Sequence, residues 1–275
     1  MRFEKWQALG NDYVIVEAAD MPAPLTAAAV RALCDRHTGI GADGILLLEP
    51  AGEPGFVARL SILNPDGSEA ELSGNGAREA IMYLRHRGWT DADQFSIATV
   101  AREIRATILS ATTCRVDMGH ARDDGIGEVE SGGRTWRFRN VSIGNPQCAI
   151  AVASIDELEA LDLDAIGPAI EHSPLFPNRT NVSWYAALDD PGAIRARIFE
   201  RGAGETTASG TGACGAAIAH VLAGGGSPVT VKLDGGELEV DVGEGLHVDL
   251  TGWAVPVYAG ELSDADRVLA QRLGQ

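Results

Sequence analysis

The sequence repeats itself at an interval close to half its length. Two glycine-rich segments, NPDGSEAELSGNGARE (64–79) and ERGAGETTASGTGACG (200–215), align with Ser73 opposite Ser209, 136 positions later in a chain of 275 residues. A single match of this kind could arise by chance in a chain with 33 glycines. Further segments nevertheless follow in the same order: Gly10 and Asn11 match Gly144 and Asn145, 95–108 matches 229–242, and 114–119 matches 247–252. The repeat therefore predicts two domains related by duplication.

Within each repeat, a strand leads through a turn into an apolar helix. Apolar and polar residues alternate over 58–62 and again over 194–198, which predicts two half-buried strands. After each glycine-rich segment an apolar stretch ends at a glycine, Gly88 or Gly224, as helices commonly do. The second of these helices has almost no polar face, so we expect it at the centre of its domain. The pattern predicts an α/β (α+β) fold.

Composition suggests where the two halves meet. The stretch ARDDGIGEVESGGR (121–134) is rich in glycine and charge, which is typical of a turn or a short linker. We therefore expect an N-terminal domain over 1–122 and a C-terminal domain over 133–260. A final helix over 261–275, with Ser263 as its cap and Asp266 three residues later, is expected to pack back on one domain.

Charge and composition narrow the classes of partner. The formal net charge of −17 disfavours nucleic acid and anionic membrane surfaces as partners. No stretch approaches the roughly 20 apolar residues that span a bilayer, so we expect a cytoplasmic protein. Histidines, cysteines and carboxylates show no metal-ligand spacing, and nothing in the sequence calls for a cofactor. A small molecule is the expected ligand.

Ser73 and Ser209 are expected at the first turn of the two predicted helices. Backbone N–H groups and the positive end of the helix dipole favour an anion there, and the following glycines let a ligand approach the backbone. One carboxylate held by both helix starts would fit this pattern. The alternative is that both serines are only N-caps, a common role for serine. A phosphate loop is disfavoured because no GxxxxGK[ST] motif is present.

Six ordered motifs covering nearly the whole chain resemble the diaminopimelate epimerase family. They are LGNDYVIVEA (9–18), RHTGIGADGILLLE (36–49), NPDGSEAELSGNGAR (64–78), IGNPQCAI (143–150), RTNVSW (179–184) and ERGAGETTASGTGAC (200–214). The resemblance implies two pseudo-symmetric domains, each with a mixed sheet wrapped around a central helix, and an active site between them. It also implies an isomerase of lysine and peptidoglycan precursor biosynthesis that needs no pyridoxal phosphate, and it suggests a homodimer.

The same resemblance implies a set of substrate-binding residues. Polar groups of the substrate would be bound by Asn11, Asn64, Asn145, Asn181, Glu200 and Arg201. The reacting carboxylate would be held at the helix starts by Gly74, Asn75, Gly210 and Thr211. Amide side chains both donate and accept hydrogen bonds, so they suit a zwitterionic ligand with two amino-acid head groups. Each asparagine taken alone also fits a turn residue, since Asn64 precedes PDG and Asn145 precedes Pro146.

The chain departs from the family at the positions that carry the chemistry. Members of this family use two cysteines, one on each face of the α-carbon, and here both positions are serine, Ser73 and Ser209. A helix dipole contributes up to about 2 kcal/mol, or roughly 1.5 pKa units, which makes a thiol a usable base but not a hydroxyl. The family histidine is Gln147, and Glu79 stands where a cysteine is common. Glu200 is the only obvious group that would assist a serine.

Three functions remain open at this point. The first is an epimerase that interconverts LL- and meso-diaminopimelate. The second is a related racemase, isomerase or dehydratase of another amino or hydroxy acid, with Glu200 or another carboxylate as base. The third is a protein that binds the ligand without turnover. The serines themselves are either natural or replacements of two cysteines, and Gln147 and Glu79 favour a natural branch because such a replacement would not explain them.

Overall fold

The computed structural model describes residues 1–262, and the chain divides into two compact units. The first unit combines Met1–Val116 with residues 253–262, and the second is Asp117–Gly252. No helix among the described residues is long and apolar enough to cross a membrane.

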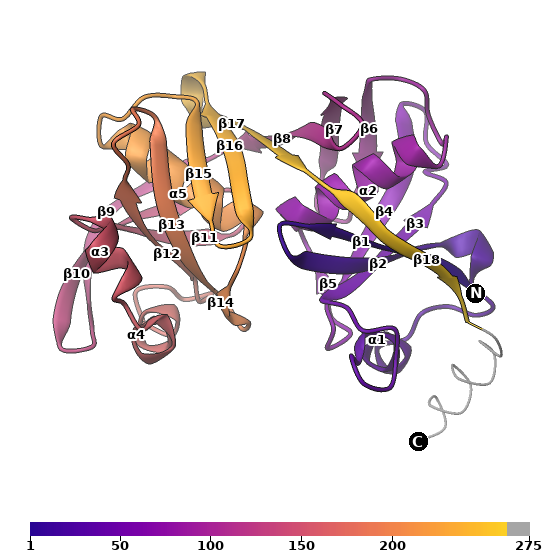
Figure 1. Ribbon diagram of the computed structural model, residues 1–275, viewed down its shortest axis with the longest axis horizontal. Coiled ribbons are helices and arrows are strands. Elements are labelled where there is room, and N and C mark those ends of the chain that lie inside the picture. Colours follow the sequence, from indigo (N-terminus) through magenta and orange to yellow (C-terminus); the bar gives the residue numbers. More distant parts are fainter. Residues whose placement is uncertain (263–275) are drawn as a thin grey trace. The chain divides into compact units, whose positions relative to one another are not determined.

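The first unit is a mixed sheet around helix α2 (Gly74–His86) (Figure 1). Neighbouring strands pair antiparallel except for two parallel pairs, β2–β3 and β4–β6. A second helix, α1 (Ala27–Cys34), lies between β2 and β3 along the chain. The strands are β18 (Val255–Glu261), β1 (Arg2–Ala8), β2 (Asn11–Glu17), β3 (Gly44–Glu49), β4 (Phe56–Leu63), β5 (Glu69–Ala70), β6 (Gln94–Ala98), β7 (Glu103–Ile108) and the first half of β8 (Thr113–His120), whose second half belongs to the other unit.

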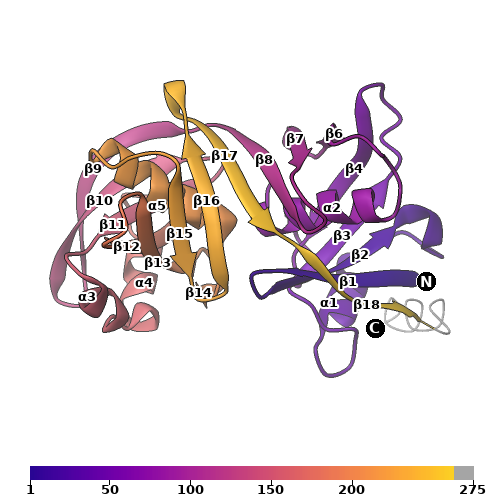
Figure 2. The ribbon, with the colours of Figure 1, turned by 45° about the horizontal axis from the view of Figure 1, so that its top comes forward.

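The second unit repeats this plan around helix α5 (Gly210–Leu222), which contacts β15 and β16 in front of it in Figure 2. Its parallel pairs are β11–β12 and β13–β15. Two short helices, α3 (Ile155–Glu159) and α4 (Leu163–Glu171), follow β11. The strands are β9 (Arg122–Ser131), β10 (Arg134–Ser142), β11 (Pro146–Ala151), β12 (Asn181–Ala187), β13 (Ala193–Glu200), β14 (Gly204–Thr206), β15 (Val229–Leu233), β16 (Gly236–Val242) and β17 (His247–Trp253).

The predicted duplication is confirmed strand for strand. The strands β1 to β4 correspond to β10 to β13, and both series contain one parallel pair at the same step. Along the chain, the central helix of each unit then lies between two strands, β5 and β6 in one unit and β14 and β15 in the other. The half-buried strands predicted over 58–62 and 194–198 are β4 and β13, with inward-facing apolar residues at alternate positions.

The central position predicted for the second helix is also confirmed. Every residue from Gly210 to Ala219 is buried, and in α2 every residue from Gly74 to Leu84 is buried. Strands on several sides contact each helix, so neither has a solvent-facing stripe at its N-terminal end. Each helix start is therefore fixed by the packing of the whole unit.

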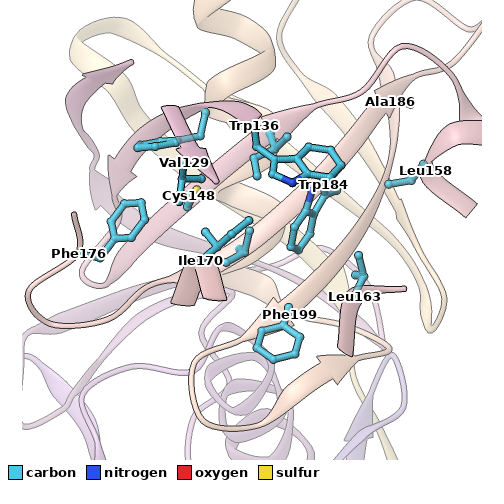
Figure 3. Packing of buried hydrophobic residues seen from close by; sticks show 13 residues of the cluster. Val129, Trp136, Cys148, Leu158, Leu163, Ile170, Phe176, Trp184, Ala186 and Phe199 are labelled. Carbon is cyan, nitrogen blue, oxygen red and sulfur yellow. The ribbon is translucent and has the colours of Figure 1, made fainter. Parts of the chain in front are cut away.

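The second unit has an aromatic core on the face of its sheet that packs against α3 and α4 (Figure 3). Trp136 and Trp184 meet edge to face with ring centroids 6.1 Å apart, and Phe138 lies 5.2 Å from Phe176. One apolar cluster of the first unit is made mainly of aliphatic side chains, among them Val14, Val30 and Ile45. Burial of large apolar side chains stabilises each unit by roughly 1.5–3 kcal/mol per residue relative to exposure.

The predicted linker over 121–134 is wrong. This stretch contains β9, which pairs antiparallel with β10 over nine residue pairs from Arg134↔Ser131 to Ser142↔Arg122. Its charges point outward, while Val129 and Ser131 are buried. Glycine and charge are tolerated here because the strand has one solvent-facing side.

The compact units also differ from the expected domains 1–122 and 133–260. Residues 117–122 belong to the second unit, and β18 belongs to the first because it pairs with β1 from Arg2↔Glu261 to Gln7↔Val255. A strand from the C-terminal end of the chain thus completes the N-terminal sheet. The helix expected over 261–275 lies, apart from 261 and 262, outside the described residues.

Candidate active site

Ser73 caps the N-terminus of α2. Its backbone is extended (φ −133°, ψ 120°), and its Oγ accepts a hydrogen bond from the N–H of Gly76 over 3.0 Å. A second donor reaches the same oxygen, because the Tyr13 hydroxyl donates to Ser73 Oγ over 3.3 Å. Tyr13 comes from β2, 60 residues earlier in the chain. The N-cap expected as the alternative role is therefore present, together with a partner that the sequence did not reveal.

Asparagine side chains link this helix start to the beginning of β2. Asn75 Nδ2 donates to Asn11 Oδ1 over 3.2 Å, and Asn11 Nδ2 donates to Asp43 Oδ2 over 2.9 Å. The fully buried guanidinium of Arg78 donates to Asn75 Oδ1 over 2.7 Å and to the carbonyl of Gly74 over 2.9 Å. Asn11, Asn75 and Gly74 are thus brought together, as the resemblance implies. We call Ser73, Tyr13, Asn11 and Asn75 the Ser73 cluster.

Ser209 caps α5 in the same conformation (φ −139°, ψ 119°). Its Oγ accepts from the N–H of Gly212 over 3.2 Å and donates to Glu200 Oε2 over 3.0 Å. The other oxygen of Glu200 accepts from Thr206 Oγ1 over 2.9 Å. Glu200 ends β13 and Thr206 ends the short return strand β14, so one hairpin holds the carboxylate against the serine. A carboxylate in this position is able to take the serine proton.

A second pair of side chains fixes the start of α5. Asn145 Nδ2 donates to Thr211 Oγ1 over 3.2 Å, and Asn145 Oδ1 accepts from Gln147 Nε2 over 2.7 Å. Gln147 is fully buried and packs on α5. A Cβ added at Gly215 of this helix would stand 2.8 Å from the Cβ of Gln147. We call Ser209, Glu200, Thr206, Asn145 and Thr211 the Ser209 cluster.

Asn181, the first residue of β12, bonds to the turn of the same hairpin, in which Arg201 lies. Asn181 Oδ1 accepts from the backbone N–H of Arg201 over 2.9 Å, and its Nδ2 donates to the carbonyl of Pro146 over 3.1 Å. The Arg201 side chain is exposed and donates to the carbonyl of Asn178 over 3.0 Å. Asn181 therefore positions the turn that follows Glu200.

Asn64 sits in a turn after β4. Its Nδ2 donates to Ser68 Oγ over 2.9 Å, and its backbone N–H donates to the carbonyl of Ser68 over 2.8 Å. These are the bonds of the turn residue that PDG suggests. In the register of the repeat, Asn64 stands where Glu200 stands in the second unit, so the Ser73 cluster has an amide at the position of that carboxylate.

The two clusters share one feature and differ in another. The pairs Asn11–Asn75 and Asn145–Thr211 occupy corresponding positions, and in both units a side chain at the second helical position bonds to the asparagine. The serine partners differ, since Ser73 accepts from a phenol whereas Ser209 donates to a carboxylate. Each of Asn11, Asn145 and Asn181 uses one donor and one acceptor within the described chain, and a carboxamide has further capacity for a ligand.

Sequence reasoning missed two buried charged groups beside these clusters. Glu171 is 3% exposed, pairs with Arg179 and accepts from the N–H of Gly202 over 2.7 Å, which ties the turn after Glu200 to α4. Glu79 is fully buried in α2. Burial raises the pKa of Glu79 well above its usual value, although Arg78 opposes this. Their buried placement depends on tertiary packing and left no local signal.

A group able to ligate a metal is formed by residues that belong to neither cluster. Asp117, His247 and Asp249 each bring one ligand atom to within 4.8 Å of the others. His247 Nε2 already lies 3.0 Å from Asp117 Oδ1, and all three residues are partly exposed. The group comes from β8 and β17, so metal-ligand spacing along the sequence could not reveal it.

Comparison with known proteins agrees with the geometry of both units. The model of the family described as diaminopimelate epimerase matches residues 3–123 and 139–255. A diaminopimelate epimerase from Pelotomaculum thermopropionicum is 41% identical, over 95% of this chain and 98% of the relative. One from Azoarcus is 40% identical, over 95% and 98% of the two chains.

More distant solved structures share the fold. A phenazine biosynthesis protein of the PhzF family from Bacillus anthracis superposes with a TM-score of 0.74 at 17% identity, covering 96% of this chain and 99% of that one. A probable proline racemase from Agrobacterium radiobacter gives 0.72 at 16% identity, covering 96% and 93%. With the family model matched across both repeats and relatives near 40% identity over almost the whole length, this chain belongs to the diaminopimelate epimerase family.

Proposed function

We propose that this chain interconverts LL- and meso-diaminopimelate by proton transfer at the α-carbon, without a cofactor. The observation that carries the proposal is the 3.0 Å hydrogen bond from Ser209 Oγ to Glu200 Oε2 at the start of α5. A serine alone is too weak a base, but a serine whose proton passes to a carboxylate is able to accept another. Membership of the family supplies the substrate class.

Glu200 would act through Ser209 in the first step. The bond between the α-carbon and its hydrogen breaks, that proton goes to Ser209 Oγ, and the serine proton moves to Glu200 Oε2. The electron pair remains on the substrate, delocalised into its α-carboxylate. Helix N-termini stabilise such charge because their first N–H groups lack intrahelical partners. We assign this role to Gly210 and Thr211 at α5, and to Gly74 and Asn75 at α2.

The remaining residues would bind the rest of the zwitterion. Asn11, Asn145 and Asn181 each retain donor and acceptor capacity, and Arg201 is exposed with a guanidinium suited to a second carboxylate. Gln147 stands at the family's histidine position and would hold Asn145 rather than move a proton, given their 2.7 Å hydrogen bond. Asn64, bonded within its own turn, would need to exchange its bond to Ser68 for one to the ligand.

The decisive experiment follows α-deuterium incorporation from D₂O into LL- and meso-diaminopimelate by NMR. We expect exchange and inversion with the unaltered chain, and a faster reaction with Ser73→Cys/Ser209→Cys because thiols are more acidic. Exchange with the double variant alone would mean that the scaffold binds this substrate but that the serine chain only binds it. Absence of exchange with both proteins would refute the substrate assignment.

A related racemase, isomerase or dehydratase of another amino or hydroxy acid is the second candidate, since the Ser209–Glu200 pair would serve any acidic α-proton. Exchange assays on a panel of amino and hydroxy acids separate the two, because only the true substrate loses its α-proton at an appreciable rate.

The family resemblance also favours a homodimer. Sedimentation velocity would show a species of twice the 28.9 kDa chain mass.

A further inference from the structure

The two serines differ in the direction of their side-chain hydrogen bonds. Ser209 Oγ accepts one hydrogen bond, from Gly212, and donates one to Glu200. Ser73 Oγ accepts two, from Gly76 and from Tyr13. Within the described chain, no acceptor for the Ser73 proton accompanies them. The Ser209 hydroxyl thus donates its proton to a carboxylate. The Ser73 oxygen accepts two hydrogen bonds, and its own proton remains able to bond to a ligand.

The chemistry of the two hydroxyls sets the direction of the Tyr13–Ser73 bond. A phenol ordinarily titrates near pKa 10, several units below an aliphatic alcohol, and is therefore the better donor. A serine oxygen that accepts from a phenol and a backbone N–H is placed to bear negative charge after losing its own proton.

The position of the Tyr13 ring is built into the sheet. Tyr13 pairs with Gly44 across the parallel strands β2 and β3, and a Cβ at residue 44 would stand 2.6 Å from Tyr13 Cε1. Only a glycine leaves room for the ring there. Tyr13 is 6% exposed, so the phenol oxygen is held at Ser73 by packing on the strand rather than by a flexible contact.

We propose that Tyr13 is the proton source behind Ser73, acting as a positioning and relay residue, so that the Ser73 cluster donates the proton that inversion requires. This proposal rests on the proposed function. A new bond forms between the α-carbon and the Ser73 proton, the Ser73 O–H bond breaks, and the Tyr13 proton moves to Ser73 Oγ. Tyr13 is left as a phenolate and Glu200 as a neutral acid, and exchange with solvent restores both. The reverse direction starts from ionised Tyr13 and protonated Glu200.

Tyr13→Phe tests the relay because it keeps the ring over Gly44 and removes only the hydroxyl. The matched control is Tyr83→Phe, which removes another buried phenol of the first unit. Tyr83 lies on α2, the helix that Ser73 caps, and its hydroxyl donates to Glu17 over 2.8 Å. For each protein, α-deuteration and inversion are followed separately by NMR and by chiral chromatography, starting from each stereoisomer.

We expect Tyr13→Phe to lower kcat for inversion by about 10²-fold, at the low end of general acid–base effects, with KM unchanged. The Ser209 cluster remains intact in Tyr13→Phe, so one stereoisomer should still exchange its α-proton with retention, at a rate within about twofold of the unaltered protein. Tyr83→Phe should change neither the rate of exchange nor the rate of inversion. Ser73→Ala should show the same pattern, and its combination with Tyr13→Phe should add nothing further.

Two results would overturn the relay while leaving the proposed function standing. One is inversion by Tyr13→Phe at the rate of Tyr83→Phe. The other is a parallel loss of exchange and inversion for both stereoisomers, which is what a structural role of the hydroxyl would give. Absence of inversion by the unaltered protein would refute the proposed function, and the relay with it.

Discussion

Glu200 accepts a hydrogen bond from Ser209 over 3.0 Å at the N-terminus of α5. The corresponding position of the first unit holds Asn64, whose amide bonds to Ser68 instead. One duplicated fold has therefore given its two serines opposite environments. Acid/base pairs are commonly made in this way, with environment rather than residue type separating the two roles.

Glu200→Gln should abolish most of the exchange at the face served by Ser209. The amide keeps the shape and accepts a hydrogen bond, but it takes no proton, so we expect kcat to fall by about 10²–10⁴-fold. Glu205→Gln is the matched control, because Glu205 lies in the same hairpin and pairs with Arg197 rather than with a serine. Full activity of Glu200→Gln in the deuterium assay would remove Glu200 from the mechanism.

Much of this arrangement was predictable from local sequence patterns. The repeat located both serines, the alternation over 58–62 and 194–198 identified β4 and β13, and the absence of a polar face placed α5 at the centre. These predictions succeeded because periodicity reports which side of an element is buried.

The contacts that distinguish the two clusters were not predictable in the same way. Tyr13 reaches Ser73 across 60 residues, and its partner Gly44 is adjacent only after β2 and β3 pair. The charged, glycine-rich stretch at 121–134 gave the wrong answer because its strand forms by pairing with β10 and not by its own propensity. Likewise, β18 completes the first sheet through cross-strand partners that lie more than 240 residues away.

Glu79→Gln should stabilise the protein, and increasingly so as the pH rises. The pKa of buried Glu79 lies well above its usual value, so the folded chain holds this proton more tightly than the unfolded chain does. The contribution of Glu79 to stability is therefore present at low pH and is lost as the pH rises through the folded pKa. Each unit by which the pKa is raised corresponds to about 1.4 kcal/mol.

Urea unfolding of Glu79→Gln and the unaltered protein between pH 5 and pH 9 measures this difference. The exposed Glu71→Gln serves as control, since removal of a solvated charge should leave the pH dependence as it is. A stability difference that stays constant over this range would show that Glu79 does not change its protonation on folding.

Asp12→Asn should destabilise the protein, and less so as the pH falls. Burial raises the pKa of Asp12, but hydrogen bonds from Arg36 and Lys5 outweigh it and hold the pKa at about 2. The stability gained above the ordinary pKa is lost as the pH falls toward that value. At pH 7 we expect Asp12→Asn to cost about 2 kcal/mol, and at pH 2 much less.

Thermal or urea unfolding at the two pH values checks this prediction. Asp20→Asn is its control, because Asp20 pairs with the largely exposed Arg2 on the surface. An equal cost of Asp12→Asn at both pH values would assign its effect to lost packing rather than to charge.

Gly212→Ala should damage the start of α5 through steric overlap. A Cβ at this position would stand 2.7 Å from Ile198 Cδ1 and 2.8 Å from Ile198 Cγ2, in the core behind the Ser209 cap. Overpacking of this kind costs typically about 1–3 kcal/mol and displaces the backbone that carries the cap. Because Ser209 Oγ must stay within reach of Glu200, we expect kcat to fall more than KM rises. Gly226→Ala is the control, since nothing lies within 4 Å of its Cβ position. Unfolding and exchange assays on both variants test the prediction, and a Gly212→Ala protein with unchanged stability and turnover would show that α5 moves freely against Ile198.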